Sequence, residues 1–281
     1  MIDKRPGAYV FKTIVYASCI LLGVISIFPF WIMFMNATRS TPEIQQQSIS
    51  LLPSIHLLDN LKIFDGKSFN PFMGFLNSLI ISVGATACAT YFSSLTAYGI
   101  VAYNWKLRKP FFTFILIVIM IPAQVVNIGF YQFMWRIGMT NSFLPLILPA
   151  IASPAIVFFM RQYLLSTLSL DIVSSARIDG AREFRIFNSI ILPMMKPAIA
   201  TQAIFVFVAS WNNFFLPLIL LTDNNMFTMP IMVSLLRGDI YRTELGAVYL
   251  GLSFSVLPLF VIYFSLSKYI IAGVQLGGVK E

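Results

Sequence analysis

The chain has 281 residues, of which 58% are hydrophobic and only 11% are charged, and its formal net charge is +8. A soluble domain carries about 25% charged residues, so this composition excludes an ordinary soluble fold and favours a lipid-embedded protein, where charge is expensive. The basic residues are scattered over short loops without a basic face interleaved with aromatic residues, which argues against nucleic-acid binding.

Six long apolar segments follow one another along the chain, and each reaches the roughly 20 residues that a helix needs to cross a bilayer. Helices are expected because a segment in lipid must satisfy its own backbone hydrogen bonds. The first segment is too long for a signal peptide and is expected to be retained. We therefore predict one all-α polytopic transmembrane domain over residues 1–281, with approximate spans at 11–35, 75–102, 111–135, 143–165, 198–221 and 245–270.

The distribution of Lys and Arg predicts the orientation of these spans. With the N-terminus inside, 13 of the 19 basic residues fall on the cytoplasmic side and 6 outside. Both termini are therefore predicted to be cytoplasmic. The two large outer loops, 36–70 and 222–244, either receive an extracellular partner or simply connect helices, and the sequence leaves both possibilities open.

A polar, basic segment at residues 169–197 interrupts the apolar pattern. Ser174 or Ser175 is expected to cap a helix, Gly180 to turn the chain, and Phe184 and Phe187 to share an apolar face with Ile191. Pro193 and Pro197 are expected to steer the chain back into the membrane. The pattern predicts a short helix, a turn and an interfacial helix offered to a soluble partner; the alternative is an amphipathic helix resting on the lipid surface.

The run Ala176-x-x-Asp179-Gly180-Ala181, followed by Phe187-x-x-Ile190-x-Leu192-Pro193-x-x-x-Pro197, resembles the EAA loop of ABC importer permeases. Three further stretches are similar to the carbohydrate-uptake, maltose-permease-like branch: Asn77-Ser78-Leu79, Trp211-Asn212-Asn213-Phe214, and Ala272-Gly273-Val274 with Gly277-Gly278-Val279-Lys280. The resemblance implies the type I ABC importer permease fold, in which this loop is a coupling helix that docks on an ATPase. It assigns the coupling role to Ser174, Ser175, Ala176, Asp179, Gly180, Ala181, Arg182, Phe184 and Phe187.

The same resemblance implies the rest of a transport assembly in a bacterial or archaeal plasma membrane. The chain would form half of a channel with a second, longer permease subunit, two copies of a cytoplasmic ATPase and an extracellular or periplasmic sugar-binding protein. The chain has no phosphate-cradling G-x-x-x-x-G-K-[ST] loop, so we expect it to bind no cofactor itself, with ATP and Mg²⁺ held by the ATPase. Two positions depart from the family pattern: Ser174 replaces the leading glutamate, and Asn213 stands where many relatives carry an acid.

Residues inside three of the predicted spans are candidates for the substrate path. Proline in a membrane helix frees carbonyls that line cavities, and sugars need hydrogen-bonding groups beside an aromatic face. The candidates are Gln124, Asn127, Tyr131, Ser210, Trp211, Asn212, Asn213 and Asn77. For each of them a structural role is the alternative, because such side chains often join helices by hydrogen bonds worth about 0.6 kcal/mol.

Other classes of protein find less support in the sequence. The one histidine, His56, lies in an outer loop without a ligand-spaced partner, so no metal site is predicted. No H-E-x-x-H or G-x-S-x-G motif is present, which argues against a membrane enzyme. An ATPase-independent secondary transporter or channel remains the alternative function, but the spans lack the acidic residues that ion-coupled carriers place in the membrane. The sequence therefore favours the permease subunit of an ATP-driven sugar importer.

Overall fold

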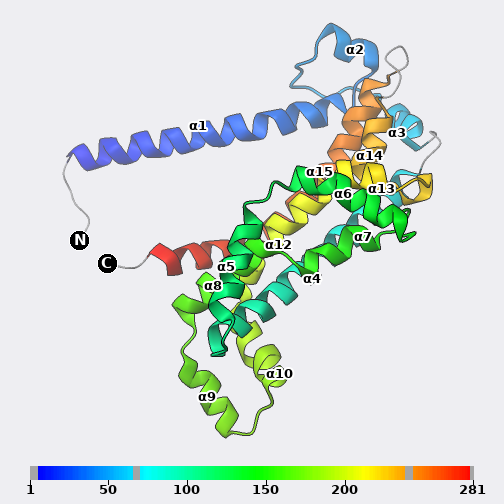
Figure 1. Cartoon of the computed structure of the whole chain (residues 1–281). Helices are drawn as coiled ribbons and strands as arrows, with labels where there is room; N and C mark the ends of the chain where they lie inside the picture. The colour runs from blue at the N-terminus through cyan, green and yellow to red at the C-terminus, as the bar shows by residue number, and fades with distance from the viewer. Residues whose placement is uncertain (1–5, 66–69, 238–242, 279–281) are drawn as a thin grey trace. The chain divides into compact units, whose positions relative to one another are not determined.

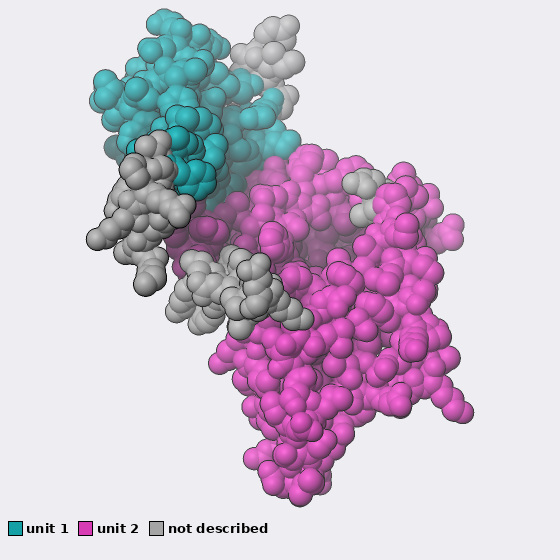
Figure 2. Space-filling model, turned by 90° about the vertical axis from the view of Figure 1, so that its left-hand side faces the viewer, with its two compact units in different colours: residues 1–71, 233–257 teal, residues 72–232, 258–281 magenta. Residues whose placement is uncertain are grey.

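The computed structural model describes residues 6–65, 70–237 and 243–278, with side chains described except at 6–10, 123–124 and 268–278. Within these residues every regular element is helical (Figure 1), which confirms the predicted all-α class. The chain forms two compact units (Figure 2): unit 1 comprises residues 1–71 and 233–257, and unit 2 comprises residues 72–232 and 258–281.

Unit 1 is built on a long apolar helix, α1 (Pro6–Asn36), two short helices, α2 (Thr41–Gln46) and α3 (Leu57–Asp65), and the first turns of α15 (Leu245–Gly278). The side chains of α1 are exposed over residues 11–31, apart from a half-buried Gly23, and become half-buried or buried over its last five residues, as expected of a lipid-facing helix that is apolar all round. A proline inside it, Pro29, does not end the helix.

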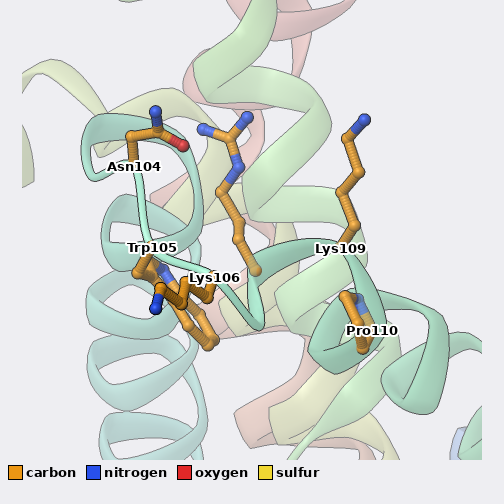
Figure 3. A pocket seen from close by; sticks show the side chains of 6 residues that line it. Asn104, Trp105, Lys106, Lys109 and Pro110 are labelled. Carbon is orange, nitrogen blue, oxygen red and sulfur yellow. The ribbon is translucent and has the colours of Figure 1, made fainter.

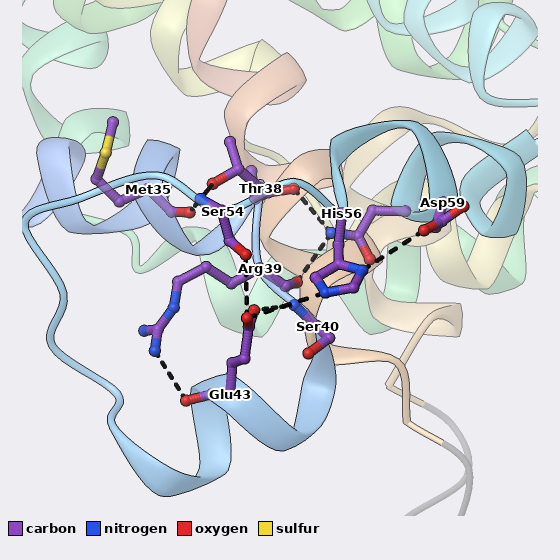
Figure 4. Close-up of polar contacts among 10 residues, drawn as sticks. Met35, Thr38, Arg39, Ser40, Glu43, Ser54, His56 and Asp59 are labelled. Carbon is purple, nitrogen blue, oxygen red and sulfur yellow. Dashed lines mark hydrogen bonds and ion pairs between the residues drawn. The ribbon is translucent and has the colours of Figure 1, made fainter.

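A polar network joins the end of α1 to the segment that carries α2 and α3 (Figure 4). Arg39 is only 7% exposed, and its guanidinium donates to the Asn36 side chain at 3.2 Å and to the carbonyls of Gln47 and Glu43 at 2.6 and 2.9 Å. These bonds compensate the buried charge. His56 lies 3.5 Å from Asp59 and 3.9 Å from Glu43, and the Ser40 backbone N–H keeps the pKa of the Glu43 carboxyl below its usual value.

Unit 2 contains most of the remaining helices. In chain order they are α4 (Pro71–Ala102), α5 (Arg108–Ile119), α6 (Ala123–Arg136), α7 (Leu144–Ile147), η1 (Leu148–Ile151), α8 (Pro154–Thr167), α9 (Leu170–Ile178), α10 (Glu183–Ile186), η2 (Phe187–Ile191), α11 (Leu192–Met194), α12 (Lys196–Trp211), α13 (Phe215–Leu220) and η3 (Asn224–Met226), with α14 (Met229–Leu235) at its edge. Its core joins α4, α8, α9, α10, η2 and α12. Small residues of α4, Ala89 and Ala97, are fully buried there and let the other helices approach closely.

Four helical stretches of the described chain are long and apolar enough to cross a membrane: Phe11–Asn36, Pro71–Ala102, Leu144–Thr167 and Leu245–Ser267. A fifth span is formed if the bent pair Glu183–Met194 and Lys196–Trp211 is counted as one. The count of six is therefore not confirmed, and the single domain with its expected span limits stays a prediction.

The predicted span at 111–135 is broken into two helices. α5 ends at Ile119, and α6 begins at Ala123, after Pro122, whose backbone is extended at φ −62° and ψ 124°. Proline lacks the N–H that a continuous helix would need and disfavours helical geometry in the residue before it. The break lies at the proline that interrupts the apolar pattern of this segment in the sequence.

Gly246 is a close-packing point of unit 1, since a Cβ there would lie 2.3 Å from the Arg39 carbonyl oxygen and 2.4 Å from the Asn60 amide. We expect Gly246→Ala to destabilise the protein by about 1–3 kcal/mol, measured as thermal unfolding in detergent. Gly99→Ala is the matched control, because a Cβ at that helical position meets no atom within 4 Å. Equal stability of the two variants would contradict this packing argument.

Candidate functional site

Residues 169–197, named the coupling segment after their predicted role, fold as the helix, turn and second helix that the sequence predicted, but a different serine caps the first helix. The Ser169 hydroxyl accepts the Asp171 N–H at 3.3 Å and caps α9. Ser174 lies inside α9, where its hydroxyl donates to the Leu170 carbonyl at 3.1 Å. The predicted cap at Ser174 or Ser175 is therefore wrong, because the helix begins one turn earlier than the pattern indicated.

The turn at Gly180 is confirmed. Gly180 has φ +78°, and the N–H groups of Gly180 and Ala181 each donate at 3.0 Å, to the carbonyls of Arg177 and Ala176. These two bonds form a Schellman motif, which ends a helix with a left-handed residue. No atom lies within 4 Å of a Cβ built at Gly180, so within this chain its backbone conformation, and not crowding, requires glycine.

A charged bridge joins the two helices across this turn. Arg177 Nε donates to Glu183 Oε1 at 2.6 Å. Arg177 lies in the last turn of α9 and Glu183 in the first turn of α10, where each charge is favourable to its own helix dipole. The Arg177 guanidinium, followed by the Tyr103 hydroxyl, lowers the pKa of the Glu183 carboxyl, so the bridge is retained above the ordinary carboxyl pKa and is lost only as the pH falls through the lowered value.

Tyr103 ties this bridge to the end of α4. Its hydroxyl donates to the second oxygen of the Glu183 carboxylate, and the Arg177 guanidinium lies 5.4 Å from the centre of its ring. Tyr103 is the first residue after α4, and its ring packs edge-on against Tyr98 at 5.6 Å. The segment that carries the turn is thus connected to a long apolar helix of unit 2.

The buried face of the segment packs against aromatic residues of α4. Phe187 is 1% exposed, and its ring lies 5.6 Å from that of Tyr91 and 5.8 Å from that of Tyr98. The Tyr91 hydroxyl also donates to the Asn188 side chain at 3.1 Å. Phe187 therefore positions the coupling segment rather than forming part of its exposed surface, and the buried Ala176 does the same on α9.

Two large apolar side chains are exposed at the tip of the segment, where α9 and α10 extend away from the other helices of unit 2 (Figure 1). Ile178 is 86% exposed at the end of α9, and Phe184 is 69% exposed on α10. The predicted apolar face of Phe184, Phe187 and Ile191 is thus only partly right, because Phe184 faces away from the core. A π-helical turn begins at Phe187, and its extra residue rotates the later part of the helix by about 100° relative to an ideal helix.

Two prolines bend the chain near the end of residues 169–197, as the sequence predicted. The helices on either side of Met195 meet at 78°. Pro193 and Pro197 lack the N–H groups that a continuous helix would use, and the Leu192 N–H donates across the π turn to the Phe187 carbonyl. The bend places the coupling segment at an angle to α12, the helix that it precedes.

Two of the substrate-path candidates are buried by packing within the chain. The Asn77 side-chain amide donates to the carbonyls of Asn225 and Phe227 at 2.8 and 3.0 Å. Trp211 is 1% exposed, stacked on Phe207 at 5.7 Å and edge-on to Phe75 at 5.5 Å. Both side chains have structural roles in this chain, which the sequence had left as the alternative.

The other path candidates lie on neighbouring elements of unit 2. Asn127 and Tyr131 are half-buried on α6, which packs against α13. The cluster that precedes α13 has Asn212 exposed and Ser210 and Asn213 half-buried, with Asn213 Oδ1 accepting the Leu216 N–H at 3.4 Å. The side chain of Gln124 lies outside the described residues. These candidates remain predictions.

The structure adds functional candidates that the sequence did not indicate. Arg177, Ile178 and Glu183 lie in the segment itself, and Tyr98 and Tyr103 lie at the end of α4, against which the segment packs. The Arg177–Glu183 spacing of six residues belongs to no regular helix, so only the turn at Gly180 brings the two charges together. The described residues contain no group of three or more His, Cys, Asp or Glu side chains that could hold a metal ion.

Residues 89–275 match the family model described as "Binding-protein-dependent transport system inner membrane component". The chain is 34% identical over 283 residues to the arabinooligosaccharides transport system permease protein AraQ of Bacillus subtilis, covering 100% of both chains. It is 32% identical to the lactose transport system permease protein LacG of Rhizobium radiobacter, over 94% of this chain and 95% of that one. It is also 31% identical to the sn-glycerol-3-phosphate transport system permease protein UgpE of Salmonella typhi, over 97% and 98%.

The fold has a counterpart among solved structures. A chain in the crystal structure of a bacterial ABC transporter involved in the import of the acidic polysaccharide alginate superposes with a TM-score of 0.80, at 19% identity, covering 96% of this chain and 100% of that one. The chain thus belongs to the family of binding-protein-dependent transport system inner membrane components, and it is a non-catalytic permease subunit with the ABC importer permease fold.

The left-handed turn gives a direct test of the segment. A β-branched residue at a left-handed position costs about 1–2 kcal/mol, so we expect Gly180→Val to lower substrate uptake about tenfold without changing the amount of protein in the membrane. Gly180→Asn is the matched control, because asparagine tolerates this conformation. Normal uptake by Gly180→Val, and by the bulkier Gly180→Trp, would contradict a role for the turn.

The bridge to α4 gives a second test. Tyr103→Phe removes only the hydroxyl that donates to Glu183, and we expect about fivefold less substrate transported per ATP hydrolysed by the complex. Tyr163→Phe is the control, because its hydroxyl makes only a long 3.4 Å bond to the Met194 carbonyl. An unchanged ratio in Tyr103→Phe, or an equal fall in both variants, would show that the bridge does not transmit movement.

Proposed function

We propose that this chain is the permease subunit of an ATP-driven importer for a sugar or oligosaccharide, and that residues 169–197 dock on a cytoplasmic ATPase. The observation that carries the proposal is the exposed pair Ile178 and Phe184 on a braced helix–turn–helix segment. Large apolar side chains at the tip of a protruding element are typical anchors of a protein interface.

The rigidity of the segment suits transmission of force. Driving a two-state channel from 1:99 to 99:1 takes about 5.5 kcal/mol of differential stabilisation, which a loose loop would dissipate. Here the tip is fixed to its own helices by the Arg177–Glu183 bridge and to α4 by Tyr103 and Phe187. A displacement of the tip is therefore passed on as a rigid-body movement.

A sugar substrate is supported by the relatives and by the chemistry of the candidate path. Two of the relatives described above are named for the transport of arabino-oligosaccharides and lactose. The polar groups of Asn127, Tyr131, Asn212 and Asn213 are chemically suited to hydroxyl-rich ligands, because amides and phenols both donate and accept hydrogen bonds. We assign the path to these four residues, Ser210 and Gln124, and give Asn77 and Trp211 lower weight because they are engaged in packing within this chain.

The complete assembly is proposed as this chain, a second permease subunit, two copies of an ATPase that holds ATP and Mg²⁺, and an external sugar-binding protein. Both termini and residues 169–197 face the cytoplasm in this proposal, as the distribution of basic residues predicts. The rival function, a carrier or channel that uses no ATPase, would leave Ile178 and Phe184 against lipid or water.

Co-purification distinguishes the two functions. We expect Ile178→Ala and Phe184→Ala to weaken retention of the ATPase in detergent extracts by about 30-fold each, as loss of an interface anchor does. Ile55→Ala is the matched control, because Ile55 is 89% exposed in a loop predicted to lie on the opposite side. Full retention of the ATPase by both variants, or the absence of any ATPase from the extract, would contradict the proposal.

A further inference from the structure

The connection between α4 and α5 forms a pocket with a high density of positive charge (Figure 3). It is lined by Asn104, Trp105, Lys106, Arg108, Lys109 and Pro110. In Figure 3 the side chains of Asn104 and Lys109 extend to the same side of the segment. No carboxylate of the described residues lies within 4.0 Å of the three cationic groups, so their charge is not neutralised within this part of the chain.

A fourth cation, Arg161 of α8, adds to this charge. α5 packs against α8, and the positive charge of Arg108 acts on the Arg161 guanidinium. That guanidinium lies 4.0 Å from the centre of the Phe112 ring, while its buried Nε has no hydrogen-bond partner in the described part of the chain. Two neighbouring guanidinium groups without a counter-charge repel each other, and a bound anion would relieve that repulsion.

The surroundings of these cations indicate an amphiphile rather than a free anion. The pocket lies where two apolar spans end, since α4 ends at Ala102 and α8 at Thr167. Trp105 packs against Phe111 at 5.7 Å, and tryptophan is typical of membrane–water interfaces. Leu107 and Phe114 are 65% and 60% exposed beside the cations and offer an apolar surface that a small soluble anion would not use.

We propose that Lys106, Arg108 and Lys109 bind the phosphate of an anionic phospholipid, with Arg161 adding to the positive charge nearby and the acyl chains against Leu107 and Phe114. Basic pockets between membrane helices on the cytoplasmic side recognise anionic headgroups in this way. Arg108 also donates to the Tyr103 carbonyl at 3.4 Å, so the bound headgroup lies next to the residue that braces the coupling segment. The lipid site itself does not depend on the identity of the transported substrate.

The test uses the complex purified through a tag on this chain and placed in nanodiscs of phosphatidylcholine with phosphatidylglycerol. A phosphatidylglycerol carrying a photoreactive group in its acyl chain is the probe, and peptide mapping locates the label. We expect labelling around residues 107–114. Each Lys or Arg contributes about fivefold to the binding of anionic lipid, so Arg108→Gln/Lys109→Gln should lower this labelling about 25-fold.

Matched variants and probes separate the other occupants of the pocket. Lys12→Gln/Lys268→Gln removes the same charge elsewhere on the predicted cytoplasmic side and should label normally, as should the charge-conserving Arg108→Lys/Lys109→Arg. Equal labelling by photoreactive phosphatidylcholine would overturn the headgroup site, and displacement of the probe by inorganic phosphate would assign the pocket to a free anion. Absence of label from the unmodified complex would mean that a partner subunit covers these cations, which would also overturn the proposal.

Discussion

The arrangement of unit 2 depends on the contact between the coupling segment and the C-terminal half of α4. Phe187 is buried against Tyr91 and Tyr98, and about one turn away the carboxylate of Glu183 receives both Arg177 and Tyr103. The aromatic contact is apolar and buried, whereas the charged contact lies near the surface, where solvent weakens an isolated ion pair. The first therefore supplies most of the stability, and the second fixes the direction of the tip.

The packing on α4 explains how the two helices of the segment, α9 and α10, form although they are short. Isolated helices of this length are marginal in water, so α9 and α10 depend on tertiary packing through Val173, Ala176 and Ile186, all of which are buried. The Schellman turn at Gly180 then determines the angle between the two helices. Because the segment is held in this way, we expect it to move together with α4 and α12. The bend of 78° at Met195 sets the angle at which it meets the start of α12.

Much of this architecture could be predicted from the sequence, because hydropathy, proline and glycine act locally. The turn at Gly180 and the bend at Pro193 and Pro197 follow from backbone chemistry alone. The exposure of Phe184 could not be predicted from periodicity, because α10 is a single turn of four residues at the tip of the segment, too short for a helical pattern to identify its buried face. The hydrogen bond between Tyr103 and Glu183, which are 80 residues apart, leaves no periodic pattern in the sequence. The same holds for the hydrogen bond from Asn77 to the Asn225 carbonyl.

The departure at position 174 now has a structural consequence for docking. Where the family motif has a glutamate, the Ser174 hydroxyl is occupied by the Leu170 carbonyl, and the nearest acid of α10, Glu183, is already engaged with Arg177 and Tyr103. The segment thus has no strong acidic anchor at position 174 to offer a partner. In the proposed docking, its exposed apolar side chains, Ile178 and Phe184, would then provide most of the affinity, because buried apolar anchors dominate interface energetics and charges at the rim mainly set orientation.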